Sequence, residues 1–130
     1  MPSVFARFRV TVHVPRRPYV EALPGIPTIR PFEALACGIP LVSAPWRDPE
    51  RLFAVGRDYL AARDGGEMRR QLDAVLSDAG LATRLSAHGR RTIAARHTCA
   101  HRVDELLAIA GGELGLDTRP EEERLECAAQ

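Results

Sequence analysis

The first clear pattern along the chain is an alternation of apolar and polar side chains over residues 7–14. Every second residue from Phe8 to Val14 is apolar, which is the spacing of a β-strand. A short apolar run over residues 39–43 predicts a buried parallel strand. Residues 58–62 are a weaker candidate for a third strand.

Helical patterns lie between and after these strands. Residues 31–38 predict a short helix, because a proline stands at the first position and a glycine at the expected stop. Asp48 followed by Pro49 predicts another short helix that ends near Gly56. Longer helices are predicted after the capping-box spacing of Asp64 and Glu67, over residues 81–96, and over residues 98–110.

The alternation of strands and helices is the rhythm of an α/β protein with a parallel sheet. About three strands are visible, whereas a complete doubly wound sheet has five or six. We therefore expect a partial Rossmann-like sheet with C-terminal helices, formed by residues 1–113. Residues 15–27 hold four prolines and predict a loop. Residues 114–130 are acidic and lack an apolar stripe, so we expect a disordered tail.

Composition narrows the function classes. The 130 residues are 45% apolar and 27% charged with net charge +1, which gives no electrostatic reason to expect a nucleic acid as partner. All 18 cationic residues are arginine, so lysine Schiff-base chemistry and a P-loop lysine are excluded. The absence of lysine and asparagine also suggests a GC-rich genome, and we expect a bacterial source.

Cysteine usage and hydropathy bear on location. Cys37, Cys99 and Cys127 are an odd, widely spaced set, which favours a reducing cytoplasm over a disulfide scaffold. No apolar run approaches the roughly 20 residues of a membrane helix, and the N-terminus shows no signal peptide. We expect a cytoplasmic protein without a membrane span.

The most informative segment is residues 25–43, where a loop rich in proline and glycine leads into a helix start. Backbone N–H groups at a helix start suit a phosphate. The carboxylate of Glu33 could accept hydrogen bonds from a ribose diol, as an acidic residue does in dinucleotide sites. If Pro31 is the first helical residue, Glu33 is the third, which is also the usual place for a purely structural glutamate. Both interpretations stay open on spacing alone.

Within this segment, FEALACGIPLVS resembles the donor-site segment of retaining glycosyltransferases with two Rossmann-like domains (the GT-B type). The resemblance covers residues 7–110. Within this class the chain is most similar to the spore-maturation-type glycosyltransferase-like branch, which PGIPTIRPFEALACG and RHTCAHRVDELL resemble over nearly their whole length. It implies a nucleotide-diphosphate sugar as partner and transfer of a glycosyl group to an acceptor. It also implies that this chain is the C-terminal, donor-binding domain and that the acceptor domain is missing.

The resemblance assigns site residues by position. Glu33 would bind the ribose of the donor, and backbone N–H groups around Thr28, Ile29, Arg30 and Phe32 would face the diphosphate. Gly25 stands where the family often has an earlier glutamate that faces the transferred sugar. Further contacts to diphosphate or sugar could come from the loop arginines and from a histidine at the end of the first strand, namely Arg16, Arg17 and His13.

Two alternatives remain at this point. The chain could be a non-catalytic fragment or interaction module that pairs with an N-terminal acceptor-domain chain or with itself. His97 and His101 have the i, i+4 spacing of a metal pair, but no third ligand is evident, and Thr98 between them is a natural helix cap. We expect neither a metal nor another cofactor.

Overall fold

The computed structural model describes residues 2–25 and 27–115. Three parallel strands form its sheet: β1 (Thr11–His13), β2 (Leu41–Ser43) and β3 (Leu60–Ala61), in the order β1-β2-β3. In the register, Val12 pairs with Val42, and Val42 with Leu60. The expected α/β fold with a partial Rossmann-like sheet is confirmed.

Six helices occur among the described residues: α1 (Pro2–Phe5), α2 (Arg17–Ala22), α3 (Ile29–Ala36), α4 (Gly65–Ser77), α5 (Ala79–Arg96) and α6 (Cys99–Glu113). The chain divides into two units, Met1–Arg96 and His97–Gln130. The first unit holds the sheet with α1 to α5. The described part of the second unit is α6, which is capped by the Thr98 side chain as the sequence indicates.

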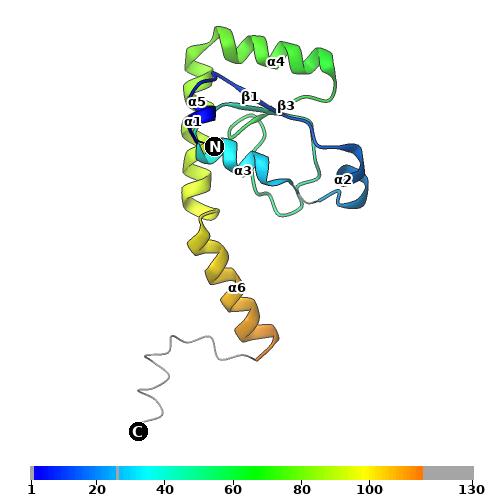
Figure 1. The fold of residues 1–130 in the computed structure, drawn as a ribbon, viewed down its shortest axis with the longest axis vertical. Helices are drawn as coiled ribbons and strands as arrows, with labels where there is room; N and C mark the ends of the chain where they lie inside the picture. Colours follow the sequence, from blue (N-terminus) through cyan, green and yellow to red (C-terminus); the bar gives the residue numbers. More distant parts are fainter. Residues whose placement is uncertain (1, 26, 116–130) are drawn as a thin grey trace. The chain divides into compact units, whose positions relative to one another are not determined.

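Within the first unit, helices cover both faces of the sheet. Helix α3 packs against β1 and β2 and also against α5, whereas α4 packs against β2 and α5. Figure 1 shows α4 on one side of the strands and α3 on the other. Because side chains alternate along a strand, Leu41 packs with Leu35 of α3, and Val42 points to the opposite face.

The core lies between the sheet, α3 and the segment after β2. Tyr59, Leu35 and Leu41 are its largest fully buried members. Helix α5 approaches α3 closely at Gly89, which is buried against the Leu35 side chain. The contact needs a residue without a Cβ at position 89, so the glycine that weakens α5 as an isolated helix serves the packing.

The strand predicted over residues 7–14 is shorter than expected and buries the opposite face. Only Thr11–His13 pair with β2. His13 is 6% exposed, whereas Val12 is 42% exposed. The reason is that β1 lies at the sheet edge and α4 packs mainly on β2, so the described chain covers the Val12 face of β1 only in part.

Two further predictions, one of a loop and one of a helix, are also wrong. Residues 15–27 contain helix α2, since a proline in the first turn is compatible with a helix. The helix predicted after Asp48 is absent. The Asp48 carboxylate does accept hydrogen bonds, from the backbone N–H groups of Leu52 and Phe53. However, Arg51 has a φ of 52°, a left-handed conformation that a helix cannot contain.

The remaining element boundaries follow local signals more closely. The Asp64 cap is confirmed, because the Glu67 N–H donates to its carboxylate, whereas Glu67 accepts from the Arg63 N–H and not from the Asp64 N–H of a complete capping box. Gly38 follows α3 with a φ of 69°, as expected for a helix stop. The tail predicted over residues 114–130 lies outside the described residues from position 116 onward.

Candidate functional site

The candidate site lies where β1, β2 and α3 meet. β1 ends at His13, β2 ends at Ser43, and Thr28 precedes α3 as its N-cap. His13 joins all three elements, because its Nδ1 lies 2.9 Å from Ser43 Oγ and its Nε2 lies 2.9 Å from Thr28 Oγ1. In open α/β sheets, ligands bind at this carboxyl edge of the strands.

The hydrogen bonds around the imidazole suit one neutral tautomer. The Ser43 hydroxyl has one proton, and the carbonyls of Ala44 at 2.8 Å and of His13 at 3.3 Å are both placed to accept it, so Ser43 accepts from His13 Nδ1–H. The Thr28 hydroxyl then donates to the lone pair on His13 Nε2 and accepts from the Arg30 N–H. His13 is therefore a neutral positioning residue that holds the start of α3 against the sheet.

Electrostatics favour the same neutral state. Burial lowers the pKa of His13 below its ordinary value of 6.5, and the nearby Arg30 guanidinium lowers it further. Both causes disfavour the imidazolium. Protonation would also place a proton on Nε2, where the Thr28 hydroxyl now donates.

This pKa shift predicts a pH dependence of stability. The unfolded chain binds a proton at His13 more readily than the folded chain does, so stability is fully present above pH 6.5 and falls as the pH decreases below it. We expect His13 to contribute a loss of at most about 1.4 kcal/mol per pH unit in that range. Urea unfolding of the wild type and of His13→Gln at pH 7.5 and 5.5 measures the effect. A pH dependence that is identical in the two proteins would contradict it.

Glu33 occupies the fifth position of α3, not the third. The helix begins at Ile29 because Thr28 caps it, and no acidic residue lies in its first turn. Glu33 therefore does not cap the helix, its structural contact is an ion pair, and it lines none of the hollows described below. Its Oε2 lies 3.5 Å from Arg30 Nε as an ion pair, and the side chain remains 30% exposed.

A hollow of about 300 Å³ opens beside this helix start. His13, Thr28, Arg16 and Arg30 line it together with apolar residues of the β1 end and Tyr19. A smaller cavity of about 20 Å³ adjoins it and is lined by prolines, Tyr19 and Trp46. Two of the three arginines predicted for the site, Arg16 and Arg30, thus face one space that also borders the helix N-terminus.

Other predicted residues lie outside this hollow. Arg17 points into solvent from α2 and only reaches Glu21 at 4.0 Å. Phe32 packs edge-to-face on Phe53 in the core. Gly25 lies beside Pro49, where it borders a separate hollow of about 450 Å³ with Arg47.

The backbone N–H groups available at the helix start are fewer than the segment suggested. Pro31 has none, and the Arg30 N–H is occupied by the Thr28 hydroxyl at 3.4 Å. A helix leaves the N–H groups of its cap and first turn without intrahelical partners. Those of Thr28 and Ile29 therefore remain as the candidates for an anionic ligand.

Sequence reasoning missed two residues of the site, Ser43 and Trp46. Ser43 is fully buried and fixes the tautomer of His13. The Trp46 ring stacks on Tyr59 with ring centroids 4.7 Å apart, and its buried Nε1–H has no hydrogen-bond partner among the described residues. A signal for Trp46 was available, because it is the only tryptophan in the chain and follows the carboxyl end of a strand.

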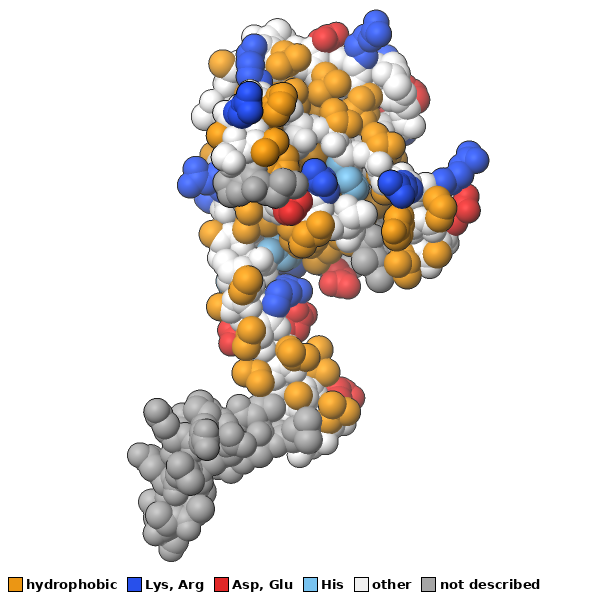
Figure 2. Space-filling model, in the orientation of Figure 1, with side chains coloured by type: hydrophobic (Ala, Val, Ile, Leu, Met, Phe, Trp, Pro, Cys, Tyr) orange, Lys and Arg blue, Asp and Glu red, His pale blue; other side chains and the backbone are white. Residues whose placement is uncertain are grey.

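Tyr59 beneath this tryptophan is a neutral packing residue. Burial raises its pKa to about 12, with further contributions from the carboxylates of Asp48 and Asp58. Its phenol therefore stays protonated at physiological pH and supports the Trp46 ring. Figure 2 shows charges of both signs interspersed with apolar side chains on the visible face, with no continuous basic surface.

Two further observations concern the described residues alone. These residues contain no group of three or more histidine, cysteine or acidic residues that could hold a metal ion. Of the predicted histidine pair, His101 contacts the helix cap, with its Nδ1 2.6 Å from Thr98 Oγ1. None of the helices in this part of the chain has the length and apolar character needed to cross a bilayer.

A parallel sheet whose strand ends meet a helix N-terminus is the arrangement of Rossmann-like domains. A comparison with protein-family models matches residues 1–108 to the family described as glycosyl transferase-like. The chain belongs to this family. Neither the curated proteins nor the solved structures include one that matches the chain significantly.

Proposed function

We propose that this domain binds the nucleotide-diphosphate sugar of a glycosyl transfer reaction at the start of α3. The observation that carries the proposal is the position of Glu33. It is a partly exposed carboxylate without a capping role, and it does not line the hollow itself but pairs with Arg30, which does. The family match is the independent support for the reaction class.

Each residue of the proposed site has a role that follows from its chemistry. Glu33 would accept hydrogen bonds from the ribose diol, as carboxylates do in other Rossmann-like domains. Arg16 and Arg30, with the N–H groups of Thr28 and Ile29, would stabilise the charge that develops on the diphosphate leaving group. This mode of stabilisation needs no metal. Arg17 and Gly25 are weaker candidates, since Arg17 points into solvent and Gly25 borders a separate hollow.

The finer assignments belong to the same proposal. The PGIPTIRPFEALACG segment supports the GT-B architecture and the spore-maturation-type branch. We place the donor-binding domain in residues 1–113, with residues 114–130 as an acidic tail. A bacterial cytoplasm suits both the supply of a nucleotide sugar and the free thiols of Cys37 and Cys99.

Calorimetric titration of the wild type with uridine, guanosine and thymidine diphosphates and their sugars tests the proposal. We expect saturable heat with at least one of these nucleotides and none with the corresponding free nucleoside, because the diphosphate provides the charge that the arginines neutralise. The absence of heat with every nucleotide would contradict donor binding.

A second candidate function is association, as an interaction module derived from such a domain. β1 is an edge strand whose Val12 is 42% exposed, and Phe8 and Val14 in the flanking segments are 63% and 67% exposed. An exposed edge with an apolar face is a site for pairing with another chain. The partner would be an acceptor-domain chain or a second copy of this one.

Analytical ultracentrifugation tests the second candidate function by measuring whether the chain self-associates. We expect Val12→Glu together with Val14→Glu to convert any dimer to monomer, because the charges would be desolvated in the interface. Val103→Glu on α6 is a control that places the same charge on another exposed valine. A purely monomeric wild type at high concentration would rule out self-association.

A further inference from the structure

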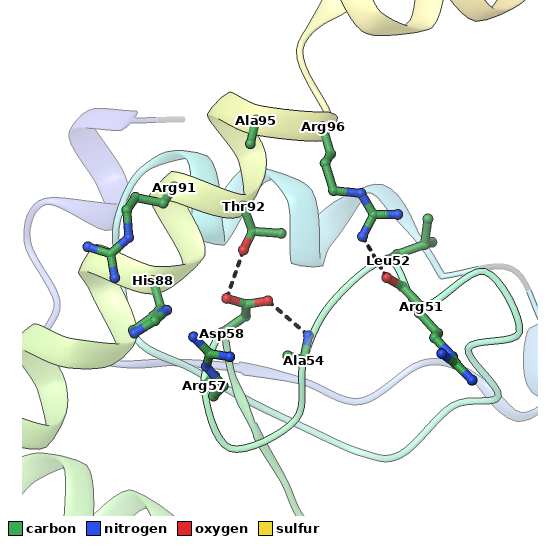
Figure 3. A pocket seen from close by; sticks show the side chains of 10 residues that line it. All are labelled: Arg51, Leu52, Ala54, Arg57, Asp58, His88, Arg91, Thr92, Ala95 and Arg96. Carbon is green, nitrogen blue, oxygen red and sulfur yellow. Dashed lines mark hydrogen bonds between the residues drawn. The ribbon is translucent and has the colours of Figure 1, made fainter.

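A second charged pocket of about 360 Å³ lies between α5 and the segment that precedes β3. We call it the arginine pocket and define it by Arg51, Arg57, Arg91 and Arg96, with His88 and Asp58. It shares no lining residue with the hollow beside α3. Figure 3 shows Asp58 near its centre and Arg57, His88 and Arg91 together on one side.

The walls of the arginine pocket are fixed by a buried carboxylate. Asp58 is 3% exposed, and its two oxygens accept one hydrogen bond each, from the Ala54 N–H and from the Thr92 hydroxyl, both at 2.9 Å. Because Thr92 belongs to α5, these bonds fasten the segment to the helix. Arg96 Nη1 adds a third link by donating to the Arg51 carbonyl at 2.8 Å. The pocket is therefore formed before any ligand arrives.

The charges around this pocket are not balanced within the described chain. Asp58 is the single carboxylate among the lining residues, and both its oxygens already accept hydrogen bonds. No ion pair among the described residues involves Arg51, Arg57 or Arg91. Several guanidinium groups gathered around one hollow raise its positive potential, which attracts an anion.

We propose that the arginine pocket binds a phosphate group of a small ligand. Planar guanidinium groups match the oxygen geometry of phosphate and donate two hydrogen bonds at once. The volume suits a small molecule. The lining residues include no phenylalanine, tyrosine or tryptophan on which bases could stack, which argues against a single-stranded nucleic acid. The phosphate could come from the donor nucleotide or from a phosphorylated acceptor, and the two sources share this chemistry.

Titration with inorganic pyrophosphate and with a sugar monophosphate tests the proposal. The wild type is compared with Arg57→Gln/Arg91→Gln and with the matched control Arg63→Gln/Arg69→Gln, whose arginines are exposed but do not line the pocket. We expect the pocket variant to lose about tenfold in affinity for pyrophosphate and the control to bind like the wild type. Backbone amide shifts of the wild-type protein should move over residues 54–58 and 88–92.

The outcomes separate the proposals. Pyrophosphate binding that survives the pocket substitutions, or that shifts only amides near residue 28, would overturn this inference. Unchanged pyrophosphate binding by Arg16→Gln/Arg30→Gln, which removes the charges of the hollow beside α3, would support it even if donor binding at α3 failed its own test. Loss of uridine diphosphate affinity in the pocket variant would identify the donor as the source, whereas loss of sugar monophosphate affinity alone would identify a phosphorylated acceptor.

Discussion

Replacing Gly89 with valine is expected to lower the free energy of unfolding by about 2–3 kcal/mol, as overpacking of a core does. A Cβ at position 89 would lie 2.6 Å from Leu35 Cδ2. Leu35 is 1% exposed and surrounded by the core, so it cannot turn away. Helices α3 and α5 would have to separate, and the side chains that α3 presents would move with it. Urea unfolding followed by circular dichroism measures the loss.

Gly65→Val is the matched control. Gly65 is also helical, at the first position of α4, but a Cβ there meets nothing within 4 Å. Valine forms helices better than glycine, so this variant should be neutral or slightly more stable than the wild type. Equal losses for the two variants would show that the close contact with Leu35 is not what position 89 requires.

Replacing Glu33 with alanine is expected to weaken binding of the donor nucleotide by about tenfold while the fold is retained. A hydrogen bond to a charged group contributes about 1.5–3 kcal/mol, and the partial exposure of Glu33 places it at the lower end. The carboxylate caps nothing, so alanine at this helical position should cost little stability. Calorimetric titration with the nucleotide that binds the wild type gives the ratio of affinities.

Glu21→Ala is the control for this substitution. Glu21 also faces an arginine of its own helix, Arg17, but Arg17 does not line the hollow beside α3, whereas Arg30, the partner of Glu33, does. It should leave nucleotide affinity unchanged. Equal affinities of wild type, Glu33→Ala and Glu21→Ala would remove Glu33 from the site.

The parts of the fold that follow from local chemistry were predictable. Asp64 and Thr98 cap their helices because the cap is made by the residue itself and its neighbours three positions on. The start of α3 was predicted two residues too late. Thr28 and Pro31 are each compatible with a helix start, but the Thr28 hydroxyl caps the helix, so α3 begins at Ile29 and not at Pro31.

The parts that depend on register and on packing were not predictable. His13 and Ser43 are 30 positions apart, and their contact exists because β1 and β2 pair in the register that aligns them. The burial of His13 in place of Val12 depends on which face α4 leaves uncovered. The arginine pocket joins Arg57 to Arg91 of a different element, and neither residue carries a local motif.

The central claim concerns one interaction, the hydrogen bonding of a ribose diol to the Glu33 carboxylate. The most direct measurement compares the affinity of the wild type and of Glu33→Ala for uridine diphosphate and for its 2′,3′-dideoxy analogue, or for the corresponding pair of whichever base binds. We expect the wild type to prefer the ribose form by about tenfold and the variant to show no preference. A preference of the same size in both proteins would contradict the claim.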